Sequence, residues 1–247
     1  MIRTPIEIQY TFRSLAGDSK PLAFHITLDP ETLTHTLPER ENAPEWARLE
    51  YRQCKDCPLD AAVHSHCPAA LSLFGIVEKS QELLSYDAVE IAVVTKQRTV
   101  SGATTAQRAL SSLLGLYLAT SGCPILAKLK PMARFHLPLA DREETLFRSA
   151  SAYLLGQYLL KQKGLPADFG LAGLRDLYRR IHEINVSLAE RLRALSAGDA
   201  NLNAIVLLDL FAQELPMSLD GKLGDFEQLF SPYFHAAIES GLGQETI

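Results

Sequence analysis

The sequence is poor in several residue types, and each shortage narrows what the protein can be. Its 247 residues include one tryptophan, three methionines and four cysteines, and 24 basic residues are outnumbered by 29 acidic ones. The resulting net charge of −5 gives no general basic surface of the kind that holds a nucleic-acid backbone, so we expect no nucleic-acid partner. A small anionic ligand in a local basic pocket is compatible with this charge.

Long apolar runs are also missing. The most apolar stretches, Leu110–Ala119 and Ala204–Ala212, are shorter than the roughly 20 residues that a membrane-spanning helix needs. The first twelve residues alternate apolar and polar side chains and lack the apolar segment of a signal peptide. We therefore expect a soluble cytoplasmic protein with no membrane segment, whose thiols are kept reduced.

The common motifs of nucleotide binding and hydrolysis are absent as well. The sequence contains no Walker loop, no GxGxxG, no GxSxG nucleophile elbow and no HExxH zinc motif. These absences exclude the most frequent assignments for a globular chain of this length.

What is present in the first hundred residues is the alternation typical of β-strands. Apolar side chains occupy every second position in Ile6–Phe12 and Leu22–Leu28. We expect further strands at Ala47–Tyr51, Val89–Thr95 and Arg98–Thr104, of which the last two would form a hairpin.

From Thr105 onward the apolar period becomes helical. The spacing predicts four main helices, and one or two short helices between Phe226 and Gly241. The predicted helices cover Leu110–Leu118 with a stop at Gly122, Asp141–Lys163 with a capping box at its start, Leu171–Leu195, and Asn201–Phe211 with a stop before Pro216.

Strands first and helices afterwards predict an α+β fold. Residues 1–104 would form an N-terminal antiparallel β-sheet with a local zinc-binding loop at 52–68. Residues 105–247 would form a mostly α-helical half, packed with the first region as one unit.

The stretch CKDCPLDAAVHSHC, residues 54–67, holds three of the four cysteines and two of the seven histidines. A tetrahedral zinc ion needs four soft ligands, and a CxxC pair turns two thiolates toward one ion. We expect Cys54, Cys57 and Cys67 to be ligands, with His64 or His66 as the fourth. The sequence does not choose between the two histidines, and it leaves open that Cys123 supplies the fourth ligand instead.

Two other interpretations of this cluster are weaker. An iron–sulfur centre usually takes four cysteines, and the stretch itself has three. A redox dithiol at Cys54 and Cys57 lacks a surrounding βαβ pattern. Four protein ligands would make the site structural, whereas three would leave a position open for water and for hydrolytic chemistry.

A second stretch, SGCP followed by PMARFH, places Cys123 directly before Pro124, which favours a helix N-cap position and a lowered thiol pKa. In one interpretation Cys123 is a nucleophile and His136 its base. In a simpler one, Cys123 is only a small buried side chain.

A third interpretation makes the same stretch an anion pocket. Lys128, Lys130 and Arg134 follow Cys123 closely and would bind a phosphate or a carboxylate together with nearby backbone amides.

Four blocks carry a family resemblance: CKDCPLDAAVHSHCPAA, SLLGLYLATSGCPIL, PMARFHLPLADREETLFRSASAYLLGQYL and LYRRIHEINVSLAERL. In these blocks and their order the chain resembles a bacterial family of uncharacterised proteins, over most of residues 45–215. The resemblance implies no activity and no catalytic residues.

These observations favour a zinc-containing cytoplasmic protein with a ligand-binding or regulatory role, forming a homodimer through its amphipathic helices. The alternative is an enzyme that acts on a small anionic substrate through Cys123 with His136, or through an open metal site.

Overall fold

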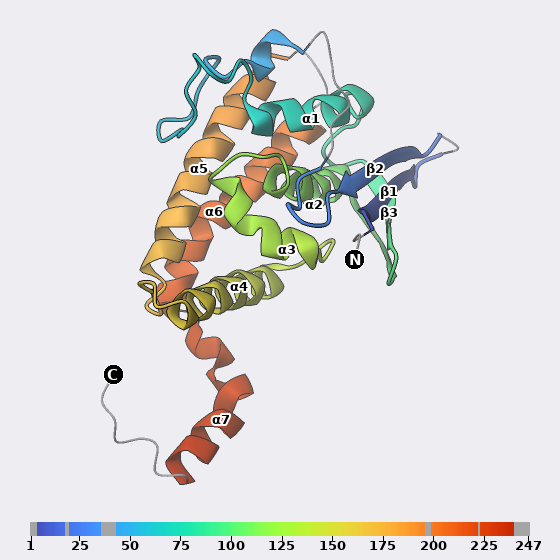
Figure 1. Cartoon of the computed structure of the whole chain (residues 1–247). Helices are drawn as coiled ribbons and strands as arrows, with labels where there is room; N and C mark the ends of the chain where they lie inside the picture. Colours follow the sequence, from blue (N-terminus) through green and yellow to red (C-terminus); the bar gives the residue numbers. More distant parts are fainter. Residues whose placement is uncertain (1–3, 18–19, 36–42, 196–198, 222, 240–247) are drawn as a thin grey trace.

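The computed structural model describes residues 4–17, 20–35, 43–195, 199–221 and 223–239 (Figure 1). It has an N-terminal four-stranded antiparallel sheet followed by a mostly helical C-terminal half, as the sequence predicted. The strands are β1 (Ile6–Ser14), β2 (Leu22–Leu28), β3 (Ala88–Thr95) and β4 (Thr99–Thr105). The α-helices are α1 (Pro68–Lys79), α2 (Ala106–Ala119), α3 (Lys130–Arg134), α4 (Arg142–Gln162), α5 (Ala172–Arg193), α6 (Ala200–Gly221) and α7 (Glu227–Glu239), and the 3-10 turns are η1 (Glu45–Ala47), η2 (Leu126–Leu129) and η3 (Leu223–Phe226).

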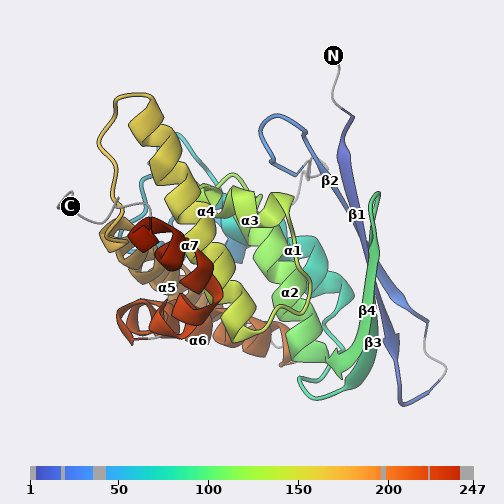
Figure 2. The ribbon, with the colours of Figure 1, turned by 90° about the horizontal axis from the view of Figure 1, so that it is seen from below.

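The sheet has the order β2-β1-β3-β4, so β1 pairs with a strand on each side. Tyr10 on β1 lies opposite Phe24 on β2 and Val93 on β3. These three side chains are buried, and the residues that alternate with them face solvent. The sheet thus covers one side of the molecule and turns a single apolar face toward the helices (Figure 2).

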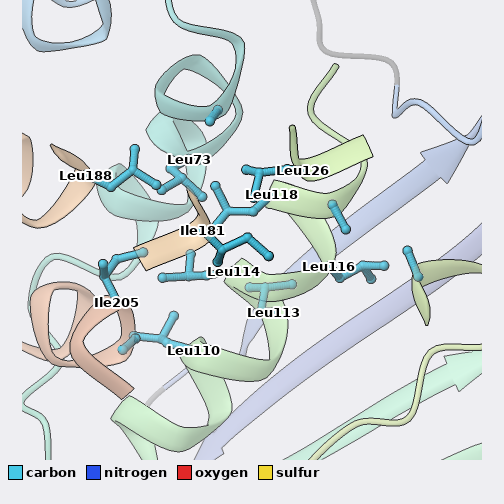
Figure 3. Close-up of a cluster of buried hydrophobic side chains, with 14 of the residues drawn as sticks. Leu73, Leu110, Leu113, Leu114, Leu116, Leu118, Leu126, Ile181, Leu188 and Ile205 are labelled. Carbon is cyan, nitrogen blue, oxygen red and sulfur yellow. The ribbon is translucent and has the colours of Figure 1, made fainter. Parts of the chain in front are cut away.

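Helix α2 begins at the residue after β4 and lies between the sheet and the helix pair α5–α6. Leu110, Leu113 and Leu114 of α2 are completely buried. Figure 3 shows them together with Leu73 of α1 and Ile205 of α6 in one apolar cluster. One continuous core therefore joins the sheet to the helical half.

Local signals placed helix α4 correctly. Asp141 accepts a hydrogen bond from the Glu144 amide, and the Glu144 carboxylate accepts one from the Asp141 amide, which completes the predicted capping box. Gly164, just beyond the helix, has a φ of +69°, the left-handed conformation that commonly ends a helix.

The expected strand at Ala47–Tyr51 was wrong. Glu45–Ala47 is a 3-10 turn, and within the described residues the segment makes one isolated bridge, between Arg48 and His66. The carbonyls that a neighbouring strand would pair with accept hydrogen bonds from the buried Arg191 side chain instead. A long-range contact therefore overrides the local alternation.

Two helices also differ from expectation. No element was expected at Pro68–Lys79, which forms α1, because this apolar segment offers little polar contrast to reveal a helical period. The expected stop before Pro216 was wrong, since α6 continues to Gly221. Leu215 and Leu219 remain buried on either side of the proline, and their packing offsets the lost backbone hydrogen bond.

Helix α6 is longer than its most apolar stretch suggested. Within the part of the chain that the structure describes, Ala200–Leu219 is the one segment whose length and composition would allow a membrane crossing. In the fold α6 packs along α5 and α2, and a core helix of a globular protein meets the same criterion. The segment is therefore weak evidence for a membrane span.

The packing around α2 predicts the effect of a core truncation. Leu114→Ala should lower the free energy of unfolding by about 2–5 kcal/mol, because it leaves a cavity among completely buried neighbours. Urea denaturation would measure this. Leu155→Ala on α4 is the matched control, since Leu155 is 59% exposed and its truncation should change stability little. An equal decrease in the free energy of unfolding in the two variants would contradict the conclusion that α2 is the central helix of the core.

Candidate metal centre

All four cysteines of the chain line one small cavity, of about 20 Å³. Cys54, Cys57 and Cys67 come from the loop before α1, and Cys123 comes from the loop after α2. All four are free thiols, and Cys123 is buried. The structure therefore brings together three cysteines that are close in sequence and one that is remote.

Backbone hydrogen bonds hold the first three cysteines in place. The Cys57 amide donates to the Cys54 carbonyl at 3.1 Å, which closes the CxxC turn. The Cys67 amide donates to the Ala47 carbonyl at 2.8 Å, and Cys67 is also the N-cap residue of α1, with Pro68 in its first turn. The loop is thus fixed at both ends of the cysteine cluster.

Burial raises the pKa of the Cys123 thiol. The amides of Leu126 and Ile125 donate to its sulfur and lower the pKa by a smaller amount. Amide donors directed at a sulfur stabilise the thiolate more than the thiol. Burial is the larger effect, so the pKa of Cys123 is raised overall and its thiolate needs a cation beside it.

Without a cation the cysteines oppose one another's ionisation. Burial and the adjacent Cys57 thiol raise the pKa of Cys54 to about 12, with smaller contributions from Cys67 and Cys123. Four thiolates around one cavity thus require positive charge nearby.

A buried guanidinium lies against the same cavity. Arg191 of α5 is 1% exposed, and its Nη1 donates to the carbonyls of Trp46 at 2.6 Å and Arg48 at 2.8 Å. No carboxylate in the described residues pairs with it, and burial lowers its pKa while the cysteines act in the opposite direction. A buried charge is normally paired, so this arginine lacks an anion that the cysteines could supply.

Neither histidine of the loop lines the cavity. His64 is exposed, and His66 is half-buried with its Nδ1 at 2.8 Å from the Ser65 hydroxyl. As the described residues stand, no three histidine, cysteine or acidic side chains are grouped closely enough to hold one ion. The four sulfurs line the cavity without closing on a single point.

His136 lies in a different cavity from Cys123. Its Nε2 is hydrogen-bonded to the hydroxyl of Tyr10, which also lies 3.1 Å from the Ser112 hydroxyl. Burial and, to a smaller extent, the nearby Arg148 charge lower the pKa of His136 to about 3. His136 is thus a neutral, structurally bonded imidazole.

The three basic residues expected to bind an anion line neither cavity. Lys130 donates to the Thr32 carbonyl at 2.6 Å and to the Thr34 hydroxyl at 3.2 Å, so it ties α3 to the turn after β2. Lys128 is exposed, and the exposed Arg134 guanidinium lies over the Phe135 ring.

Comparison with protein families finds one match, a model for a domain of unknown function, DUF6901, over residues 8–231. The chain belongs to this family. The match covers both the sheet and the helical half, in agreement with the resemblance to an uncharacterised family. Comparison with curated proteins and with solved structures gave no match.

Sequence reasoning missed Arg191. The residue occurs at a helical interval after Ile184 and Leu188, in line with the buried face of α5. A charged residue at an apolar position is a signal that could have identified it. Its hydrogen-bond partners, more than a hundred residues earlier in the chain, could not have been inferred.

The lowered pKa of the half-buried His136 predicts its protonation state. The unfolded imidazole has a pKa of about 6.5, so between that value and about 3 the unfolded state binds more protons than the folded one. This histidine should therefore lower the stability progressively as the pH falls through that interval. Nitrogen-15 NMR of the imidazole at pH 5 should show the neutral ring, and a charged His136 in folded protein would contradict the assignment.

Proposed function

We propose that the protein is a metalloprotein in which Cys54, Cys57, Cys67 and Cys123 hold one thiolate-bound metal centre. The observation that carries this proposal is the gathering of all four cysteines around one cavity that is also lined by the buried Arg191. Four cysteines are a complete ligand set for zinc and for an iron–sulfur cluster.

The charges at the site fit such a centre. A divalent ion with four thiolates carries a net charge of about −2, and so does the common oxidised cubane cluster with its four cysteines. The Arg191 guanidinium would then have the anion that the described residues otherwise lack. The amides of Ile125 and Leu126 add two donors to the Cys123 sulfur.

The CxxC pair favours zinc. The argument against an iron–sulfur cluster was that the loop contains three cysteines and such a cluster usually takes four. Cys123 supplies the fourth cysteine. Four sulfurs that lie around one point suit a single zinc ion, with Zn–S bonds of ~2.3 Å. Four sulfurs that surround a larger volume suit an iron–sulfur cluster. The shared chemistry is therefore a soft metal centre, and metal analysis distinguishes its two forms.

The role that this arrangement supports is structural. A centre with four protein ligands has no open position for a substrate. It would join the loop before α1 to the turn after α2, beside Arg191 on α5. The enzymatic alternative receives no support from a Cys123–His136 pair, because these residues line different cavities. A reducing, cytoplasmic location belongs to the proposal because the thiols must stay free.

Metal content tests the ligand set. Protein purified without oxygen or chelator should contain about one zinc per chain, or iron and sulfide with the visible absorption of an iron–sulfur cluster. Cys123→Ser should lose most of the metal, as should Cys54→Ser, because a thiolate ligand is removed.

The matched controls are His64→Ala and His66→Ala, which should keep their metal. Loss of metal from His66→Ala with full retention in Cys123→Ser would instead make the histidine the fourth ligand. Wild-type protein without zinc or iron would overturn the proposal.

Arg191→Gln tests the charge on the centre. Glutamine can still donate to the backbone carbonyls but carries no charge, so chelator should remove the metal roughly 10–100 times more readily, as for other groups that support metal ligands. Arg52→Gln is the control, since Arg52 belongs to the same region but its side chain is 61% exposed. Equal rates of metal loss in the two variants would show that the Arg191 charge is not felt at the centre.

A further inference from the structure

A second cavity, with no cysteine in its lining, has a volume of about 440 Å³ and is bordered by α2, α3, the start of α4, α5 and α6. Its walls are mainly aliphatic and aromatic. They include Leu116, Leu118, Leu129, Met132, Ile181 and Phe211. Small-molecule sites usually occupy roughly 300–1,000 Å³ and combine apolar walls with a few polar groups, so this cavity has the size and lining of a ligand site.

One buried polar group in its wall lacks a partner. Asn185 of α5 is 2% exposed, and its Nδ2 makes no hydrogen bond to any described residue. Three other buried side-chain atoms share that condition, but only Asn185 lines this cavity. An unsatisfied buried donor destabilises the fold, and an acceptor on a bound molecule would remove that cost.

The charged groups of the cavity are all positive. Arg148 lies in the wall and Arg108 is exposed, and no acidic residue is among the lining residues. The Arg148 Nη2 donates to the carbonyls of Met132 at 2.9 Å and Phe135 at 3.0 Å. Among the described residues no carboxylate forms an ion pair with Arg148, and the Glu144 carboxylate, one turn earlier on α4, acts on it only at longer range, so its charge is available to an anion.

The two donors come from different helices, Arg148 from α4 and Asn185 from α5. The hydroxyl of Ser149, the residue after Arg148 on α4, lies 2.7 Å from the Tyr178 hydroxyl, and Asn185 follows Tyr178 by seven residues, or roughly 10 Å along the helix. Ile181 lies between them and lines the same cavity. A molecule that meets both donors must therefore be elongated and apolar in its middle.

We propose that this cavity binds an elongated apolar organic acid, with its carboxylate paired to Arg148 and an oxygen near its far end accepting a hydrogen bond from Asn185. The neighbouring His136 is hydrogen-bonded to Tyr10 and adds no charge of its own. The preference for an anion then comes from the positive charge of the arginines. The preference for a long molecule comes from the hydrogen bond to Asn185.

The first experiment compares three probes of equal length by isothermal titration calorimetry with the full chain. Decanoate should bind at least about tenfold more tightly than decanol, because a charge-assisted hydrogen bond to Arg148 is lost with the alcohol. Decylammonium should bind more weakly than both. Equal binding of acid and alcohol, a preference for the amine, or no binding of any of them would overturn the proposal.

Variants then assign the two ends. Arg148→Gln should remove the preference for acid over alcohol, whereas Arg148→Lys should retain it and so exclude simple misfolding. Lys128→Gln, an exposed lysine outside the cavity, is the matched charge control and should change nothing. A preference that persists in Arg148→Gln would overturn the assignment of the carboxylate.

The far end is tested with decanoate carrying a ketone on its second-last carbon. Wild-type protein should bind this ketone about fivefold more tightly than decanoate, and Asn185→Leu should abolish the difference while still binding decanoate. The same advantage in both proteins would overturn the role of Asn185. Because metal content is measured separately, failure of this site leaves the cysteine centre unaffected.

Discussion

The constraint on which the rest of the structure depends is the position of α2 between the sheet and the α5–α6 pair. The sheet has one apolar face that must be covered, and α2 covers it while burying its opposite side against α6. Leu110, Leu113 and Leu114 are completely buried for this reason. Whatever fixes the ends of α2 therefore fixes how the two halves of the molecule meet.

Both candidate sites are attached to this helix, and their chemistry differs because their walls differ. Cys123 follows the C-terminal end of α2 and lies with the other cysteines beside Arg191. Ser112 and Leu116 of α2 line the larger apolar cavity instead. Soft ligands next to one buried cation suit a metal centre, whereas apolar walls with unpaired donors suit an organic anion.

Local patterns predicted the sheet strands, the capping box of α4 and the amphipathic face of α5, because each depends on residues that are neighbours in sequence. Local patterns failed where a remote residue decides. The segment Ala47–Tyr51 alternates like a strand, yet the Arg191 guanidinium donates to two of its carbonyls, those of Arg48 and Leu49. In the same way HSHC offered two histidines near the cysteines, while the fourth thiol at the cavity comes from a loop that follows β3, β4 and α2 in the sequence.

Helix α5 connects the two sites, because adjacent faces of it form a wall of each. Ile184, Leu188 and Arg191 line the cysteine cavity, while Ile181 and Asn185 line the larger one. A packed helix moves as a unit. A metal centre that fixed the position of Arg191 would therefore also fix the position of Asn185 in the wall of the neighbouring cavity. Under the proposed function, a metal centre of this kind would act by preorganising the wall against which an elongated ligand would have to fit.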